Sequence, residues 1–539
     1  MLKRRNQELS KGRPGSWRHF PSLHLSAICI LLTGCTLMRN DPYTEIEVDE
    51  DLFTRIDALD LESMTVAPDA VPAKEAAPEE LMLTLEEVRA ITLENNLELK
   101  VELFNPRIAE ARTASVEARK YEAVFNASSS YRVTDYNQDF GSFLSQRRYS
   151  DIGAGVSMPL QSGGRFGLNM SDSEIRADGE PTTYSSPVYF SVSQPLLEGA
   201  GRREFMHEIR VARYDSQKVR AETKLRMIEV IVAADTAYWD LYKKRKVLTV
   251  RQQQYRLAEA QLDSARRLVA AGESPEIELL RAEAGLAGQQ SSIIQAENEV
   301  RQSQRRLKYI MNNPDVPVAG PTELIPQTEA DPVRYELDQD KLIAYALENR
   351  MELLQLELDL ASNASVLRHL RNAKLAEFNL TAAYGLRGTG TARDDAYNGV
   401  LDRDNEEYQI GLNIAYPLGN KAAQSDLAGA VLSRAQIEDM QTNREALIRQ
   451  EVYNAMDGLE TSWQQILANR QSAMVEGRLY EAEQRQFEIA MRTSTDVLEA
   501  QSRFADSQSG EYEALANYQI ALLELARATG TLLGAAKVE

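Results

Sequence analysis

Few side chains in this 539-residue sequence have the type and spacing that chemistry requires. His207 and His369, the histidines beyond the amino-terminal region, both lie on helical stretches, and neither has further ligands at metal-site spacing. Gly199 and Gly201 follow an expected strand and precede an expected helix, but the third glycine and the later acidic residue of a dinucleotide-binding motif are missing. We therefore expect no enzymatic activity, no metal and no cofactor.

A group of charged residues lies near the carboxyl end of the sequence. Asp496 and Glu499 are three positions apart on an expected helix, so their carboxylates lie on one face of it. Arg492 precedes Asp496 by four positions. The simplest interpretation is a solvated helix end with an Arg492–Asp496 ion pair worth roughly a few tenths of a kcal/mol.

The composition excludes several classes of protein. The chain has 81 acidic and 61 basic residues, a net charge of -20, which disfavours nucleic acid as a partner because phosphate binding requires a basic surface. Two cysteines form neither a disulfide framework nor a paired-cysteine metal site. The sequence has no run of 18 apolar residues, so no membrane-spanning helix is predicted, whereas strands of alternating polarity remain compatible with a membrane.

The amino terminus reads as an export signal. Six Lys and Arg residues precede a short apolar stretch, Leu23 to Leu32, and Thr33, Gly34 and Cys35 follow it. This ending resembles a bacterial lipobox, so we expect a signal peptide over residues 1–34 and lipidation of Cys35. The alternative is a buried structural cysteine. Residues 35–80 are rich in Asp, Glu, Pro and Ala and are predicted to form an acidic disordered tether.

The remainder of the chain repeats itself. Residues 85–99 recur as residues 339–353 at an offset of 254, and a seven-residue apolar ladder recurs at an offset of 218. The ladder positions are Ala234, Leu241, Leu248, Tyr255, Leu262 and Val269, matched by Val452, Leu459, Ile466, Ala473, Tyr480 and Phe487. We expect a first repeat over residues 81–313, a Pro-rich linker over 314–336 and a second repeat over 337–534.

Apolar residues repeated every seven positions predict long, supercoiled helices. Each repeat contains one very long helix flanked by shorter ones. The expected long helices cover 203–271, about 100 Å at 1.5 Å per residue, and 422–490, and the shorter ones cover 83–122, 275–311, 338–377 and 493–529.

Between these helices the period of the pattern changes to two, which predicts strands. Four principal strands are expected, near residues 125–133, 188–193, 378–386 and 408–416, and an additional hairpin is expected near 152–172. One face of these strands is mostly apolar and the other is largely Gly, Ser, Asn and Thr. This pattern suits lipid on one side and water on the other. Four strands cannot close a barrel, so the barrel must be shared between copies of the chain.

Together, the lipobox, the two repeats, the strand pairs ending in Gln194-Pro195 and Tyr416-Pro417, and the helix turns after Gly272 and before Asp496 resemble the TolC-like outer membrane factor family. The resemblance covers about residues 81–534. It implies a mainly α protein with a β-barrel part, in which homotrimers form a twelve-stranded barrel and a periplasmic helical tunnel. It further implies an exit duct for efflux or type I secretion, with outer membrane lipid, a periplasmic adaptor and an inner-membrane pump as partners.

The resemblance also assigns roles to the helix turns. The second turn would constrict the pore as a gate, with Asp496 and Glu499 forming acidic rings, Arg492 holding a neighbouring helix and Phe487 packing behind them. Such rings repel one another and bind cations. Both turns would be adaptor-docking tips, and these comprise Gly272, Glu273, Ser274, Pro275, Thr493, Ser494 and Thr495.

Two other classes remain open at this point. A periplasmic adaptor also contains a long helical hairpin, but it would not repeat itself. A structural coiled-coil lipoprotein without channel activity would lack the alternating strands. The additional hairpin and the long acidic tether are where this sequence departs from the family, and the hairpin leaves the strand count open.

Overall fold

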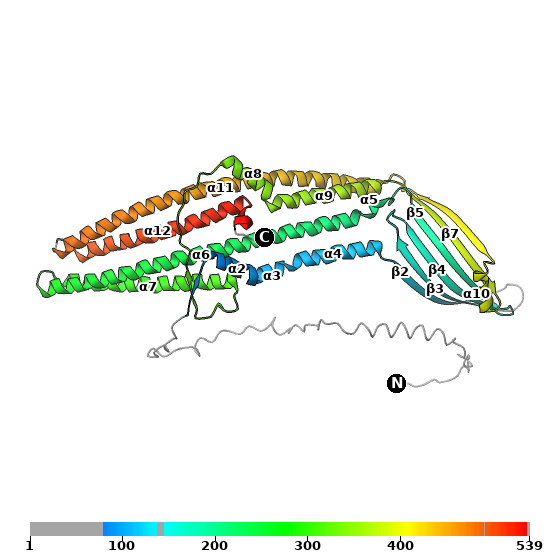
Figure 1. Ribbon diagram of the computed structural model, residues 1–539, viewed down its shortest axis with the longest axis horizontal. Helices are drawn as coiled ribbons and strands as arrows, with labels where there is room; N and C mark the ends of the chain where they lie inside the picture. The colour runs from blue at the N-terminus through cyan, green and yellow to red at the C-terminus, as the bar shows by residue number, and fades with distance from the viewer. Residues whose placement is uncertain (1–78, 137–144, 490, 536–539) are drawn as a thin grey trace, which may run out of the picture. The chain divides into compact units, whose positions relative to one another are not determined.

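The computed structural model describes residues 79–136, 145–489 and 491–535 (Figure 1). Helical segments and groups of strands alternate twice along the chain, and both groups of strands belong to one large sheet. The elements of the first series are β1 (Glu80–Leu83), α2 (Leu85–Asn95), α3 (Leu97–Glu102), α4 (Phe104–Tyr121), β2 (Val124–Tyr136), β3 (Ser145–Pro159), β4 (Arg165–Ala177), β5 (Thr183–Pro195), α5 (Arg202–Phe205), α6 (His207–Ala270) and α7 (Glu276–Met311). Those of the second are β6 (Glu323–Pro326), α8 (Gln339–Asn349), α9 (Met351–Asn372), β7 (Glu377–Gly390), α10 (Arg393–Leu401), β8 (Glu406–Ala415), α11 (Lys421–Glu488), α12 (Ser494–Ala528) and α13 (Leu532–Ala535).

The element boundaries reproduce the offsets of the sequence repeat. Helix α8 begins and ends 254 positions after α2, and α12 begins 218 positions after α7. The long helices α6 and α11, of 64 and 68 residues, lie close to the ranges that the apolar ladders predicted. At 1.5 Å per residue, α6 is about 96 Å long.

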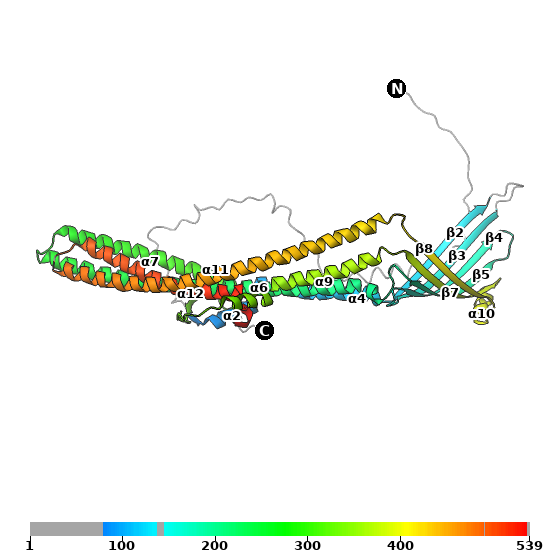
Figure 2. The same ribbon diagram turned by 90° about the horizontal axis from the view of Figure 1, so that it is seen from above.

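The seven-residue ladder of α11 is its buried face. Val452, Leu459, Ile466, Ala473, Tyr480 and Phe487 are all buried, and Ile448 is the one further buried residue of this helix. Helix α11 packs along α12, and α6 packs along α7, α9, α12 and α4 (Figure 2). In α6 the ladder residues Ala234, Leu241 and Leu262 are buried and the others are half-buried.

A small second sheet joins the start of the described chain to the segment between the repeats. Strand β1 pairs in parallel with β6, which lies within the expected linker 314–336. The hydroxyl of buried Tyr238 in α6 donates to the carbonyl oxygen of Leu83 at 3.1 Å and accepts from the backbone N–H of Thr328 at 2.9 Å. The Pro-rich segment is therefore held against α6 by hydrogen bonds. The tether expected over 35–80 is outside the described residues except at its end, where Glu80 begins β1.

The large sheet is antiparallel throughout, with the strand order β2-β3-β4-β5-β7-β8. The expectation of about four strands per chain is therefore too low for this sheet. The additional hairpin predicted at 152–172 forms β3 and β4, and it lies within the sheet between the first two principal strands of the chain.

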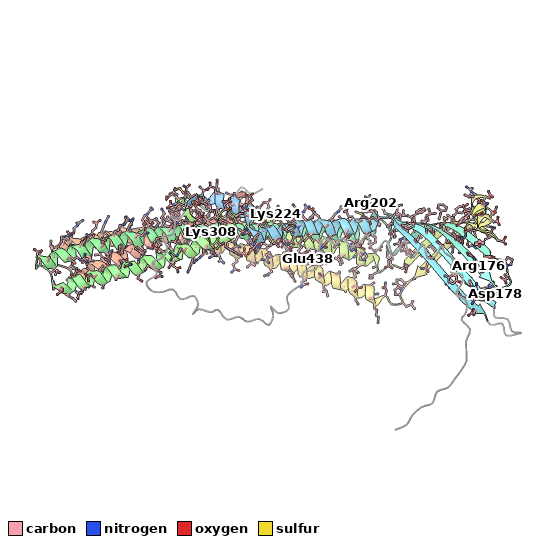
Figure 3. The ribbon with its side chains drawn as sticks, turned by 90° about the horizontal axis from the view of Figure 1, so that it is seen from below. Arg176, Asp178, Arg202, Lys224, Lys308 and Glu438 are labelled. Atoms are coloured by element: carbon pink, nitrogen blue, oxygen red, sulfur yellow. The ribbon has the colours of Figure 1, made fainter. Side chains whose placement is uncertain are left out.

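One end of the sheet adjoins the helices. Arg202 lies where the strands meet the helices, whereas Arg176 and Asp178 lie at the far end of the strands (Figure 3). At that far end, between β7 and β8, lies helix α10, which the sequence did not predict. Its backbone approaches β7 closely. A Cβ added at Gly388 of β7 would lie only 1.7 Å from the carbonyl oxygen of Ala396, so this position has room for glycine alone.

Candidate functional site

The turn between α6 and α7 is a tight reversal. Gly272 has a φ of +75°, a backbone conformation that residues with a side chain rarely adopt. Its N–H donates to the carbonyl oxygen of Val269 at 3.0 Å. Pro275 then caps the start of α7 with extended backbone. Gly272, Glu273 and Pro275 are exposed and Ser274 is half-buried, so this predicted tip presents most of its residues to solvent.

The turn between α11 and α12 is closed by a capping box. Thr493 is the N-cap, and its backbone N–H and hydroxyl donate to the Asp496 carboxylate at 2.9 and 2.8 Å. These bonds hold the pKa of the Asp496 carboxyl below its ordinary value. Thr493 thus caps the start of α12.

The four predicted gate residues occupy different environments. Glu499 is exposed and Asp496 is half-buried. Phe487 is only 2% exposed and packs with Tyr480 and Val497 in a cluster that also contains residues of α6 and α7. Phe487 therefore lies in the core of the tip and does not line a surface of this chain.

Arg492 is oriented toward α11. Its Nε lies 3.1 Å from Glu483 Oε2 and donates to Gln486 Oε1 at 3.1 Å. The close Arg492–Asp496 ion pair that the spacing suggested is wrong for this structure, because the Arg492 guanidinium lies on Glu483 and Gln486. Arg492 instead ties the turn to the last two turns of α11. The charge of Arg492 still helps to lower the pKa of Asp496.

A residue that the sequence analysis did not single out joins the two tips. Glu278 of α7 is 7% exposed, and its carboxylate accepts from the backbone N–H of Ser494 at 2.7 Å. Arg281 Nη1 donates to the other carboxylate oxygen of Glu278 at 2.6 Å. A carboxylate at a helix N-terminus is favoured by the unpaired N–H groups there. No local signal distinguishes Glu278 from its neighbours Glu273 and Glu276, since the contact joins residues 216 positions apart.

The large sheet has two faces of opposite character. In an antiparallel pair, directly opposed residues share a face. One face carries mostly apolar side chains, among them Phe125, Val156, Leu168, Phe190, Tyr384 and Ile410. The opposite face carries mostly small and polar residues, among them Asn126, Gly155, Asn169, Ser191, Ala383 and Gln409. A shallow cavity of about 450 Å³ lies on this polar face, against Asn169, Ser191 and Gln409.

Glycines on the polar face leave room for side chains of neighbouring strands to lie against the sheet. A Cβ added at Gly155 would lie 2.2 Å from Asn169 Oδ1, and one at Gly385 would lie 2.5 Å from the Tyr189 ring. Side chains from neighbouring strands thus lie flat across these glycines. The polar face can line a water-filled space, while the apolar face suits lipid.

The two histidines lie side by side although they belong to different helices. His207 of α6 and His369 of α9 stack with their ring centres 4.4 Å apart and their planes 6° from parallel. His207 Nδ1 lies 3.0 Å from Ser365 Oγ, and Glu204 pairs with His369. Burial, with a smaller contribution from His369, lowers the pKa of His207. Within residues 79–136, 145–489 and 491–535, no group of three or more potential ligands is arranged to hold a metal ion.

Cys35 and the signal peptide lie outside the described residues. No helix in the described part of the chain combines the length and the apolar character that crossing a membrane would need.

Known proteins of one kind resemble this chain in sequence. Residues 342–531 match the family model for the outer membrane efflux protein. The chain is 24% identical over 369 residues to the outer membrane efflux protein BepC of Brucella suis, covering 68% of this chain and 76% of BepC. It is 34% identical over 136 residues to the alkaline protease secretion protein AprF of Pseudomonas aeruginosa, covering 24% of this chain and 27% of AprF.

Solved structures share the fold. The CmeC outer membrane channel of Campylobacter jejuni has a TM-score of 0.62 at 15% identity, covering 83% of this chain and 86% of CmeC. The outer membrane protein VceC of Vibrio cholerae has a TM-score of 0.59 at 12% identity, covering 83% of this chain and 96% of VceC. Residues 342–531 and the sequence relatives thus make this chain similar to outer membrane efflux proteins, and the long helical hairpins and the six-stranded sheet share the fold of the solved channels.

Proposed function

We propose that this protein is the outer membrane exit duct of a tripartite efflux pump or a type I secretion system. Three copies would form a β-barrel and a periplasmic helical tunnel, through which small molecules or polypeptides leave the cell. A periplasmic adaptor and an inner-membrane pump would complete the assembly. Transport through such a duct needs no covalent chemistry.

The observation that carries this proposal is the amphipathic sheet. Its apolar face includes Leu168 and Phe190, and its opposite face includes Asn169 and Ser191, in one continuous register. Both edge strands of the sheet, β2 and β8, have one side without a partner strand within the described chain. Open edges are not tolerated in lipid, so the sheet requires further copies to close.

The gate of the duct would lie at the second turn, as the family resemblance implies. The exposed Glu499 and the half-buried Asp496 would form acidic rings around the symmetry axis. Arg492 would hold the turn through Glu483, and Phe487 would keep α11, α12 and α6 packed behind it. Glu278 adds a tie between the two helical hairpins.

The adaptor would dock on both turns. Gly272, Glu273, Pro275, Thr493 and Thr495 are exposed and could contact a partner directly. Ser494 is fully buried and bonded to Glu278, so within the docking tip it supports the turn and does not face the adaptor.

The sequence supports a lipid anchor in the outer membrane. Cys35 follows a lipobox-like ending and would carry the lipid after removal of residues 1–34, and residues 35–80 would connect this anchor to the folded chain. The protein would then extend from the outer membrane into the periplasm.

Planar-bilayer recording on the purified full-length protein tests the proposal. We expect cation-selective openings of low conductance, and a larger conductance in the double variant Asp496→Asn/Glu499→Gln. The control Glu513→Gln removes a charge from an exposed residue of α12 away from the turn and should leave the conductance unchanged. A protein that stays monomeric and never conducts would contradict the proposal and favour an adaptor or a structural coiled-coil lipoprotein.

A further inference from the structure

The β3–β4 hairpin is an internal part of the sheet. Its own pairing runs without a gap from Pro159 opposite Arg165 to Arg147 opposite Ala177. On one side β3 pairs with β2 along the full length of β2, and on the other side β4 pairs with β5. Because the hairpin separates β2 from β5, these two strands cannot pair with each other in this fold.

The hairpin continues both faces of the sheet without a change of register. Its apolar side chains lie in line with those of the principal strands, since Val156 is opposite Phe125 and Leu168 is opposite Phe190. Its small and polar residues continue the other face, where Gly155 is opposite Asn126. A segment folded as a plug or as a surface flap would not need to match both faces.

The hairpin turn is fixed at the junction with the helices. The carbonyl oxygen of Ser162 accepts from the backbone N–H of Gly201 at 2.7 Å and from Gln194 Nε2 at 3.0 Å. Gly163 has a φ of +88°, and a Cβ there would lie 2.2 Å from the carbonyl oxygen of Gly199. The turn therefore packs against the corner where β5 leads into α5 and α6, so hydrogen bonds hold the base of the hairpin at this corner.

The strand directions permit closure with further copies. Each of the six strands is antiparallel to its neighbour, so the two edge strands β2 and β8 run in opposite directions. Strand β8 of one copy can therefore pair with β2 of the next as another antiparallel neighbour. An insertion of two strands preserves this alternation, whereas one extra strand would create a parallel pair at the seam.

We propose that the hairpin is part of the barrel wall, so that three copies of the six-stranded sheet close a barrel of 18 strands. The occupant of each open edge is a second copy of this chain. This inference rests on the proposed trimeric duct. Barrel diameter grows roughly linearly with strand number, so the barrel is about 1.5 times as wide as the twelve-stranded barrel that the family resemblance implies.

The hairpin widens the barrel without widening the helical tunnel. At the end of the sheet that adjoins the helical body, the six strands connect to α4, to α6 through the short α5, to α9 and to α11. The hairpin connects to no helix of its own, because β3 and β4 are joined by the turn at residues 160–164. The duct consequently broadens where it enters the membrane, and its turns, not its barrel, set the size of solute that passes.

Electron cryomicroscopy of the purified full-length protein in lipid nanodiscs tests the strand count directly. We expect 18 strands in a continuous wall, with β3 and β4 between β2 and β5. A wall of twelve strands with the hairpin outside it, or folded into the lumen, would overturn the inference. If such a protein still conducted ions in planar bilayers, the proposed function would stand and this inference alone would fail.

Cysteine labelling in liposomes gives an independent readout. We expect a water-soluble maleimide to label Asn169→Cys and to leave Leu168→Cys unlabelled. The matched pair on β5, Ser191→Cys and Phe190→Cys, reports the same two faces of a principal strand, and the unmodified chain gives the background from Cys29 and Cys35. Equal labelling of both β4 variants, with the β5 pair still distinguished, would place the hairpin outside the wall and overturn the inference.

Discussion

The carboxylate of Glu278, in the first half of the chain, accepts a hydrogen bond of 2.7 Å from the backbone N–H of Ser494, in the second half. Glu278 caps the N-terminus of α12 from the side of α7, and the Ser494 hydroxyl lies 3.4 Å from the Glu278 carbonyl oxygen as its donor. The two helical hairpins are therefore joined where they turn. Any movement that separates the α11–α12 turn from α7 must break these bonds.

Replacing Glu278 should loosen the second turn. In Glu278→Ala the buried N–H of Ser494 loses its acceptor, at a cost of about 1–3 kcal/mol for an unsatisfied buried group. We expect faster hydrogen exchange at the start of α12 and a higher open probability in planar bilayers. Glu278→Gln keeps an acceptor oxygen and should have a smaller effect. The control Glu276→Ala, at an exposed position of the same helix, should match the unmodified protein, and an equal effect of both alanine variants would contradict the role of Glu278.

The capping box at Thr493 should determine when Asp496 loses its charge. Because the pKa of Asp496 is lowered in the folded protein, the stabilisation from this carboxylate is complete above the ordinary Asp value of 3.8. It is lost as the pH falls through the lowered pKa. In a single chain Asp496 should therefore be charged above its ordinary pKa of 3.8, and an acid transition at higher pH in the assembled duct would come from repulsion between the Asp496 carboxylates of neighbouring copies.

Thr493→Ala tests this assignment. Loss of the hydroxyl removes one of the hydrogen bonds that lower the pKa of Asp496, so the acid transition should move to higher pH in recordings of conductance against pH. Thr495→Ala changes an exposed neighbour outside the capping box and should leave the transition in place. A transition that moves equally in both variants would show that the cap does not control Asp496.

The heptad ladders could be predicted from the sequence because they are local. Every ladder position of α11, from Val452 to Phe487, is buried in the structure. A period of seven places successive residues on one helix face, whatever the partner helix is. In α6 only Ala234, Leu241 and Leu262 of the ladder are buried, and many other positions are buried as well, because this helix contacts several others along its length.

Contacts between distant segments could not be predicted in this way. His207 and His369 stack although they lie on different helices, and nothing in either local sequence indicates the other. Equivalent positions of the two repeats can also carry different residues that make the same contact. Asn96 Nδ2 donates to the carbonyl oxygen of Ile310 at 2.8 Å, and at the equivalent place in the second half Arg350 Nη1 donates to that of Ala528 at 3.1 Å. The equivalent contact is thus made by an asparagine in the first repeat and by an arginine in the second.

The strand count illustrates a third limit. Alternation of residue types indicated the hairpin strands and their faces, but it does not specify which strands become neighbours. Only the observed register places β3 beside β2 and β4 beside β5. The sequence therefore predicted the hairpin but not its position inside the sheet.

The lipid anchor can be tested apart from the fold. In Cys35→Ala we expect no acyl groups on the mature chain by intact mass spectrometry and retention of the uncleaved amino terminus. The barrel strands should still hold the protein in the outer membrane, so detergent should remain necessary to extract it. The matched variant Cys29→Ala lies within the expected signal peptide and should be processed normally. Acyl groups on the Cys35→Ala variant would contradict the lipobox assignment. Absence of acyl groups from the chain without substitutions would contradict it as well.

The ion pair between Arg89 and Asp235 should stabilise the middle of the helical body. Arg89 Nη2 and Nε donate to the two carboxylate oxygens of Asp235, with a shortest distance of 2.6 Å, and Asp235 is 1% exposed. Removal of one partner leaves a buried charge, so Arg89→Ala should lower the free energy of unfolding by about 3–5 kcal/mol. Guanidinium denaturation in detergent measures this change. Arg112→Ala, at an exposed position of α4, should change it little.

The pH dependence of that loss identifies its cause. Burial raises the pKa of Asp235 above its ordinary value, and Arg89 opposes the rise. Without Arg89 the pKa rises further. Folding then takes up a proton between the ordinary and the raised pKa, so the free energy of unfolding falls as the pH rises through that interval. The Arg89→Ala defect should therefore be smaller below the interval than at neutral pH. The double variant Arg89→Ala/Asp235→Asn should recover part of the neutral-pH loss, and a defect independent of pH would indicate lost packing instead of a buried charge.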